Sequence, residues 1–377
     1  MAKLSDYVSI KASSKKLVGD DFWLLNLEMV EQQTGRVIEY NRVSADKLDG
    51  SIIQFDTDCV LYSKLRPNLN KVVLPEIDGY ATSEMLPLRP DTSVLSREYL
   101  AEYLRSDHFV TWAISKTAGA KMPRLGSKEL LSKELHIPSL EEQAHIVALF
   151  QRVAELIDTK KQELELLDEL VKSRFIELFE GSNYPFEPLD NNVIEMFIGP
   201  FGSSLKNEVF VDEENGFCMV YEQKHAIQKT MDVPTRYVPK SKYEELKRFT
   251  ILGGDIIVSC RGTIGEIFVV PNDAPMGIMH PSIMKIRLNT EKYNQKFFVF
   301  ALEQYMDEHS AEAKGSGVKM AVSATVLGQS DFVIPPIDVQ DQFAAFVEQS
   351  DKSKLAVQNS IAELEELKKS LMQKYFG

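Results

Sequence analysis

The chain has 377 residues, of which 44% are hydrophobic and 26% are charged, a composition typical of soluble proteins with room for two or three domains. No apolar run has the eighteen or so residues of a membrane span, and the first ten residues lack the apolar core of a secretory signal. We therefore expect a cytoplasmic protein with no membrane partner. The three cysteines, Cys59, Cys218 and Cys260, have the spacing of neither a disulfide framework nor a zinc site.

The net charge of −13 argues only weakly against nucleic acid as a partner, because its distribution is uneven. Residues 1–140 are close to neutral, whereas residues 141–180 contain twice as many acidic as basic residues. Binding to DNA requires a local basic face rather than a basic total.

Residues 1–136 form a first block that is rich in predicted strands. Two strands joined by a Thr-Gly turn are expected from Trp23, and two apolar runs between Asp58 and Pro75 flank a polar segment. A helix is predicted over Ser96–Trp112, and a small-residue basic loop begins at Thr117.

The polar segment and the basic loop supply the candidate DNA contacts of this block, which are Lys64, Arg66, Asn68, Asn70, Lys71, Lys121 and Arg124. Arg and Asn make bidentate contacts to guanine and adenine edges, while Lys neutralises phosphate. A solvated connection between two strands would have the same composition, so that interpretation stays open.

Residues 137–181 predict one long helix. Between Leu140 and Gly181 there is neither Pro nor Gly, and apolar residues recur at alternating steps of four and three, as in a coiled-coil seam. Only Lys160 and Arg174 interrupt this stripe. At 1.5 Å per residue such a helix would be roughly 60 Å long, and it needs a partner.

Residues 182–333 form a second block with its own candidate loops. The loop GPFGSSLK contains Gly202, Ser203, Ser204 and Lys206, and its free backbone N–H groups could hold a phosphate, although it could equally be a tight turn. Strands are predicted at Ile256–Ser259 and Glu266–Val270, and the glycines between them would permit close approach to a ligand. The remaining candidate DNA contacts of this block are Lys224, His225, Arg261, Thr263 and Lys319.

Residues 334–377 repeat residues 137–181 at an offset of 197 positions. Ile137, Pro138 and Gln143 match Ile334, Pro335 and Gln340, and Phe179 matches Phe376, among others. A period this long indicates two copies of a larger unit rather than a solenoid. The second copy is therefore the expected partner of the first helix.

The chain contains none of the common catalytic motifs. A dinucleotide fingerprint, a Walker A loop, HExxH and GxSxG are all missing from the sequence, and the six histidines show no metal-ligand spacing. We therefore expect no catalytic residue, no metal site and no cofactor in this chain, and a recognition or assembly role rather than an enzyme.

The duplicated segments and the block motifs together resemble the specificity subunits of type I restriction–modification systems. The motifs are IPSLEEQ at 137–143 and IPPIDVQ at 334–340, LYSKLRPNLNKV at 61–72, GYATSEMLPLRP at 79–90, GPFGSSLK at 199–206 and GDIIVSCRGTIG at 254–265. One departure is Val339, where the family usually has an acidic residue before Gln.

This resemblance implies an α+β protein with two globular target recognition domains, separated by two long antiparallel helices that form an intramolecular coiled coil in a pseudo-twofold repeat. The domains would be 1–136 and 182–333, and the helices 137–181 and 334–377. Each domain would read one half of a bipartite, asymmetric site in double-stranded DNA.

The resemblance also implies partners. The helices would dock two methyltransferase subunits that modify adenine at N6, and ATP-dependent restriction subunits would complete the complex. S-adenosylmethionine, ATP and Mg would then belong to those subunits. A coiled-coil scaffold that does not read DNA sequence, or the specificity subunit of a methylation-only system, remains the alternative.

Overall fold

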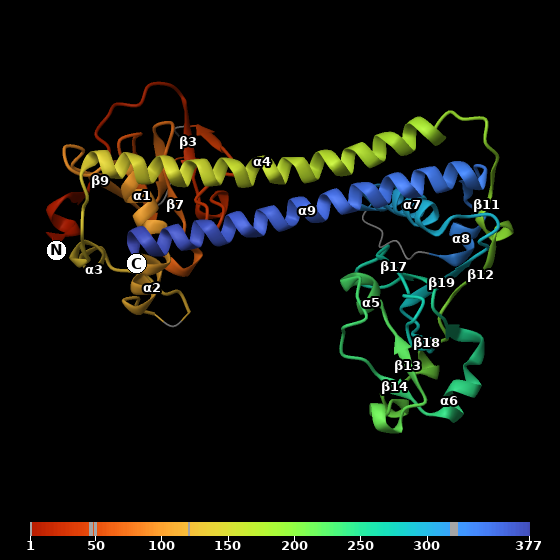
Figure 1. The fold of residues 1–377 in the computed structure, drawn as a ribbon. Helices are drawn as coiled ribbons and strands as arrows, with labels where there is room; N and C mark the ends of the chain where they lie inside the picture. The colour runs from red at the N-terminus through yellow and green to blue at the C-terminus, as the bar shows by residue number, and fades with distance from the viewer. Residues whose placement is uncertain (1, 45–47, 49–50, 120, 317–322) are drawn as a thin grey trace. The chain divides into compact units, whose positions relative to one another are not determined.

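The computed structural model describes residues 2–44, 48, 51–119, 121–316 and 323–377, with residues 310–316 described by their backbone only. The chain divides into two compact units, the first formed by Met1–Leu164 with Ala356–Gly377 and the second by Glu165–Leu355. Both long helices, α4 (Leu140–Phe179) and α9 (Ile337–Phe376), contribute one part to each unit (Figure 1).

The first unit is built from short strands followed by helices. In chain order these elements are β1 (Ala2–Lys3), β2 (Val8–Ile10), β3 (Asp21–Leu25), β4 (Arg42–Ser44), β5 (Ile52–Phe55), β6 (Val60–Ser63), β7 (Val72–Val73), β8 (Gly79–Thr82), β9 (Met85–Pro90), α1 (Arg97–Arg105), α2 (Asp107–Ser115), α3 (Ser127–Ser132) and β10 (Glu134–Leu135). They form two four-stranded sheets, in the orders β2-β9-β6-β7 and β4-β3-β8-β5, and β1 pairs separately with β10.

The second unit repeats this plan. Its elements are β11 (Phe186–Pro188), β12 (Val193–Ile198), β13 (Cys218–Tyr221), α5 (Gln223–Gln228), β14 (Tyr237–Val238), α6 (Lys240–Glu245), β15 (Thr250–Ile251), β16 (Ile256–Ser259), β17 (Ile267–Val269), β18 (Gly277–Met279), β19 (Ile283–Leu288), α7 (Gln295–Ser316), α8 (Ala324–Gln329) and β20 (Asp331–Val333). The sheet orders β12-β19-β16-β17 and β14-β13-β18-β15 correspond strand by strand to those of the first unit, and β11 pairs with β20 as β1 does with β10.

The two units share even their unusual parallel pair. β3 runs parallel to β8, and β13 runs parallel to β18, while the other strand pairs are antiparallel. In each unit the second strand of the parallel pair begins with a glycine, where the backbones approach too closely for a side chain. A Cβ at Gly79 would lie 2.7 Å from the Trp23 oxygen, and one at Gly277 would lie 2.6 Å from the Met219 oxygen. The internal repeat seen in the long helices therefore extends through the sheets between them.

Within the first unit, α4 and α9 pack antiparallel. The start of α4 buries Ile146, Phe150 and Val153 from the predicted seam. The ring of Phe150 stacks on Phe376, near the end of α9, at a centroid distance of 5.8 Å.

Within the second unit, the other ends of the helices meet in the same antiparallel sense. Phe175 near the end of α4 lies 5.5 Å, centroid to centroid, from Phe343 near the start of α9. Farther along, Lys354 forms a 2.5 Å ion pair with Asp168. The predicted antiparallel pairing of the two long helices is confirmed, as is the α+β class.

Lys160 and Arg174, which interrupt the seam, each bind a carboxylate on their own helix. Lys160 lies 2.6 Å from Glu163, and Arg174 lies 2.7 Å from Glu177. Both charges are thus partnered within α4.

A buried glutamine joins the start of each long helix to the rest of the unit in which that start lies. The Gln143 amide accepts a hydrogen bond from Ser96 N (2.8 Å), just before α1, and donates to Val94 O (2.8 Å) and Pro138 O (2.9 Å).

Gln340 repeats this arrangement in the second unit. It accepts from Asn294 N (2.9 Å), just before α7, and donates to Lys292 O (2.9 Å) and Pro335 O (2.8 Å). Both glutamines are fully buried, so the match of these two residues in the repeat has a structural cause: each fixes the start of a long helix.

Two local predictions need correction. The predicted helix over Ser96–Trp112 is two helices, because Ser106 breaks the chain direction and its hydroxyl accepts from Phe109 N to cap α2. After β3, the second predicted strand is reduced to an isolated bridge between Val30 and Val37. The predicted pair at Ile256–Ser259 and Glu266–Val270 is confirmed as β16 and β17.

Candidate nucleic-acid interface

In the second unit, the turn between β16 and β17 presents Arg261 and Thr263 to solvent. The turn is held at its base, where Gly265 N donates to Ser259 O and Glu266 N donates to the Ser259 hydroxyl. Gly262 has a φ of 69°, a conformation that favours glycine. The sequence therefore builds a rigid base that carries an exposed Arg side chain.

Two other segments lie against this turn. Cys260 N donates to Ser282 O in the turn between β18 and β19. His280 lies in the same turn, and a Cβ at Gly199, just after β12, would lie only 2.3 Å from the His280 oxygen. The start of the GPFGSSLK loop and the Arg261 turn are therefore brought to one edge of the sheet.

The rest of the GPFGSSLK loop is largely exposed. Gly202, Ser203 and Lys206 are open to solvent and Ser204 is half-buried, while Leu205 packs in the core beside Val220 and Ile278. Leu205 thus anchors the loop and leaves its polar residues outside.

The segment after β13 adds a charged group to the same neighbourhood. The buried Glu222 carboxylate pairs with Lys224 at 2.8 Å and with Arg236. Arg236 also lies over the Phe210 ring, 3.9 Å from its centroid. Sequence reasoning missed Arg236 and Glu222, since only the pairing of separate strands brings them together.

Burial in this neighbourhood affects His280. Desolvation lowers its pKa, with the nearby Glu222 carboxylate opposing the shift and Arg236, Arg261 and Lys224 adding to it. These mutual effects place the candidate residues Lys224 and Arg261 in one electrostatic environment.

His225 does not fit its predicted role of contacting DNA. Its ring is fully buried, and Nδ1 lies within hydrogen-bond distance of both the N–H and the oxygen of Glu222. Burial lowers its pKa. His225 is therefore a structural residue beneath the surface that Lys224 occupies.

The corresponding turn of the first unit presents Arg66. This residue has a φ of 49°, its N–H donates to Pro123 O, and its side chain is exposed. Leu65 forms a bridge with Arg124, which pairs with Glu84 at 3.0 Å, and the Lys64 ammonium donates to Ser83 O at 2.8 Å. The structure thus gathers Lys64, Arg66 and Arg124 at one place, where the side chains of Arg66 and Arg124 are exposed.

The far end of the same segment turns inward. Asn70 is buried and its amide donates to Arg105 O (2.9 Å), while the Lys71 ammonium donates to Leu27 O (2.5 Å). Burial lowers the pKa of Lys71, with Glu28 opposing the shift. Asn70 and Lys71 stabilise the loop through these hydrogen bonds, and that they contact DNA stays a prediction.

Two more predicted residues lie elsewhere. Asn68 is exposed, and its backbone oxygen accepts from the Gln33 amide at 3.0 Å. Lys121 is exposed in the loop that ends at Arg124, whereas Lys319 lies outside the described residues.

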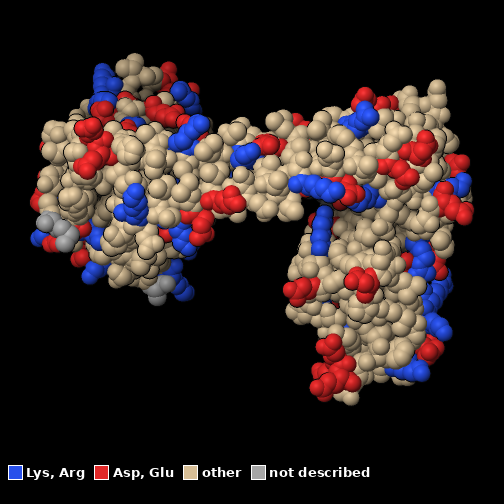
Figure 2. Space-filling model, viewed as in Figure 1, with Lys and Arg blue, Asp and Glu red and all other residues tan. Residues whose placement is uncertain are grey.

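Lys and Arg are interspersed with acidic residues over the visible surface, and the clearest run of basic residues follows α6 (Figure 2). Among the described residues, no group of three or more His, Cys, Asp or Glu could hold a metal ion. A search of those same residues finds no helix able to cross a membrane.

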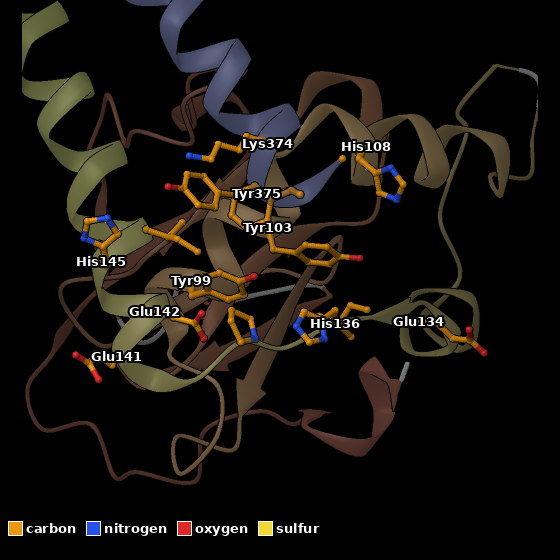
Figure 3. A pocket seen from close by; sticks show the side chains of 15 residues that line it. Tyr99, Tyr103, His108, Glu134, His136, Glu141, Glu142, His145, Lys374 and Tyr375 are labelled. Atoms are coloured by element: carbon orange, nitrogen blue, oxygen red, sulfur yellow. The ribbon is translucent and has the colours of Figure 1, made fainter.

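The first unit also contains a cavity of about 790 Å³ between α1, the start of α4 and the end of α9. Tyr99, Tyr103 and Tyr375 line it together with His136 and several carboxylates (Figure 3). The Tyr103 hydroxyl is buried without a hydrogen-bond partner. None of the predicted contact residues lines this cavity.

The family model for the type I restriction modification DNA specificity domain matches residues 48–169 and 205–368. The chain is 26% identical over 156 residues to the type I restriction enzyme EcoDI specificity subunit of Escherichia coli, a match that spans 40% of this chain and about a third (34%) of that protein. It is also 23% identical over 306 residues to the putative type I restriction enzyme MjaX specificity subunit of Methanocaldococcus jannaschii, covering 76% of this chain and 69% of that one.

Solved structures share the fold. A chain from work on complex assembly and conformational transition of the type I R-M system has a TM-score of 0.73 at 17% identity, covering 100% of this chain and 96% of that chain. The HsdS subunit from Thermoanaerobacter tengcongensis has a TM-score of 0.52 at 18% identity, covering 100% and 95%.

Proposed function

We propose that this chain selects the DNA sequence on which a type I restriction–modification complex acts. The family model matches well over half of its length, so the chain belongs to the type I restriction modification DNA specificity family. Specificity subunits of this family recognise DNA and do not themselves catalyse a reaction. We propose that residues 1–136 and 182–333 are its two target recognition domains, each reading one half of a bipartite, asymmetric site in double-stranded DNA.

One observation carries this proposal. The same double-sheet scaffold occurs twice and presents an exposed Arg at the equivalent turn, Arg66 in one unit and Arg261 in the other. Around these two side chains the loops differ in length and composition. A shared scaffold with different loops suits two modules that read different sequences, since base contacts specify and the scaffold only positions them.

The long helices fit the role of a spacer. Each spans 40 residues, which corresponds to roughly 60 Å of helix. Fixed separation matters because DNA presents equivalent groove faces about every 34 Å, and a flexible linker would not hold two readers in phase.

The helices also offer apolar surface for partners. In the second unit Leu166 and Leu170, one turn apart on α4, are 62% and 51% exposed. Leucines this exposed on one helix face suit contact with another protein. The proposed partners are two adenine-N6 methyltransferase subunits, joined by ATP-dependent restriction subunits in the cytoplasm.

In this proposal the cofactors belong to the partners. S-adenosylmethionine, ATP and Mg would be bound by the methyltransferase and restriction subunits, and the target base would be extruded into the methyltransferase.

Methylome sequencing tests the proposal directly. Cells expressing the chain with its methyltransferase subunits should show N6-methyladenine at one bipartite motif, and purified complex should shift a duplex that carries that motif. Assembly with methyltransferase but no motif preference would instead indicate a scaffold.

A further inference from the structure

The segment after the first strand of the parallel pair occupies the same place in both units. Gly79 and Gly277 fix the correspondence, since each abuts the backbone oxygen of the matching residue, Trp23 or Met219. Three residues farther along, Asn26 therefore corresponds to Glu222. The local geometry agrees: Asn26 N lies 3.4 Å from the Met29 sulfur, and Glu222 N donates to the His225 ring at 3.0 Å.

The side chains at the next positions differ between the units. Leu27 and Glu28 follow Asn26, whereas Gln223 and Lys224 follow Glu222. The same backbone frame thus carries different side chains in the two units. In each unit it lies against the turn segment that presents the exposed Arg: the Leu27 oxygen accepts from Lys71, and Gln223 lies beside Gly262. Positions with this property can distinguish two half-sites while the fold stays constant.

Gln223 has an incomplete set of hydrogen bonds. Its Oε1 is buried without a partner, and the side chain as a whole is half-buried. A polar atom left unpaired in this way costs on the order of 1–3 kcal/mol, so its presence calls for an explanation. A ligand that completes the hydrogen bonds would recover that cost on binding.

The amide faces the Arg261 turn. A Cβ at Gly262 would lie 3.6 Å from Nε2 and 3.9 Å from Oε1 of Gln223. Gly262 therefore lies directly beside the amide, and a side chain at this position would touch it. Because the last torsion of Gln is broad, the amide can turn over and present either atom there.

The backbone around Gln223 is held firmly. On one side Glu222 is fixed by Lys224 and Arg236, and on the other the buried His225 ring packs against Tyr221 at a centroid distance of 5.4 Å. Held between these neighbours, the backbone at Gln223 loses little further freedom when the residue binds.

From these contacts we infer that Gln223 reads an adenine in the half-site of the second unit, next to the base contacted by Arg261. A Gln amide matches the N6 donor and N7 acceptor of adenine in the major groove. The amide oxygen is buried in the free chain, so the amide turns outward on binding, after which the oxygen accepts from N6 and the N–H donates to N7. This inference rests on the proposed function and adds a residue and a base type to it.

The test compares methylation motifs of complexes that contain Gln223→Ala, Gln223→Glu or Gln228→Ala. Gln228 is a matched control, because it is an exposed glutamine at the other end of α5. Gln223→Ala should lose about tenfold or more of its preference for adenine at one base pair of one half-site, since a bidentate contact discriminates to this degree. Gln223→Glu should lose it as well, and Gln228→Ala should keep the wild-type motif.

Other outcomes separate the inference from the proposed function. An unchanged motif for Gln223→Ala, with a bipartite wild-type motif, would overturn the inference alone. Absence of a motif for the wild type would overturn the proposed function. If Gln223→Ala abolishes methylation, gel shifts of the purified complex on duplexes with single base-pair changes decide, and a uniform loss at every position refutes base reading.

Discussion

Gln143→Ala should destabilise the first unit strongly, because Gln143 connects the start of α4 to the segment before α1. Truncation leaves Ser96 N–H, Val94 C=O and Pro138 C=O without the partner they have at 2.8 to 2.9 Å. Each buried group left unpaired costs about 1–3 kcal/mol, and such losses are not additive. We expect a loss of about 3–5 kcal/mol, a large part of the stability of an ordinary domain.

The distribution of tryptophan makes this measurable. Both tryptophans, Trp23 and Trp112, lie in the first unit, so their fluorescence reports on that unit, whereas circular dichroism reports on the whole chain. In urea, Gln143→Ala should lower the fluorescence midpoint by more than about 1 M. Gln340→Ala should act mainly on the transition of the second unit.

Gln151→Ala is the matched control, since Gln151 is exposed on the same helix. We expect it to stay within about 0.5 kcal/mol of the wild type. The reasoning is refuted if Gln143→Ala and Gln151→Ala have the same fluorescence midpoint.

Three further predictions concern charge, assembly and spacing. Burial by itself raises the pKa of Asp56, but hydrogen bonds from Arg89 and Ser13 lower it to about 2. Because this folded-state pKa lies below the unfolded value of 3.8, Asp56→Asn should lower the unfolding free energy by about 2 kcal/mol at neutral pH. The difference between variant and wild type should vanish as the pH falls from about 4 to about 2. A difference that does not depend on pH would contradict this. The double variant Leu166→Glu, Leu170→Glu should bind the methyltransferase at least about tenfold more weakly, measured by size exclusion or calorimetric titration, with thermal unfolding unchanged. Undiminished assembly would exclude this face of α4 as the docking site. Deleting one heptad from both α4 and α9 shortens each helix by roughly 10 Å. The two halves of the methylated motif should then lie about three base pairs closer, or methylation should stop. Unchanged spacing between the half-sites would refute the role of the helices as a spacer.

Local sequence patterns were sufficient for the long helices and their pairing. A 4-3 apolar repeat lies along one side of a helix, so over this length it predicts a long helix with a partner. The repeat of Gln143 at Gln340 identified that partner within the chain, and the β16–β17 turn around Arg261 followed from its glycines. The helices and the turn depend on neighbours in sequence, and the pairing is visible as an internal repeat, which is why the sequence specifies them.

The roles of single polar side chains depend on tertiary structure. Asn70, Lys71 and His225 have side chains suited to DNA. Asn70 and Lys71 instead donate to backbone oxygens of distant segments, and the buried His225 ring bonds the backbone of nearby Glu222. Composition cannot distinguish an inward from an outward side chain in a loop, because loops lack a period that fixes their faces.

The same reason hid Gln223 at the sequence level. The side-chain oxygen of Gln223 is unpaired, and Gly262, nearly forty residues later in the chain, lies beside the amide. Gln223 also corresponds to Leu27 in the other unit. These relations appear only in the folded chain. The sequence by itself thus determined a duplicated scaffold on two paired helices. Which polar side chains of that scaffold face solvent was decided only when the strands paired.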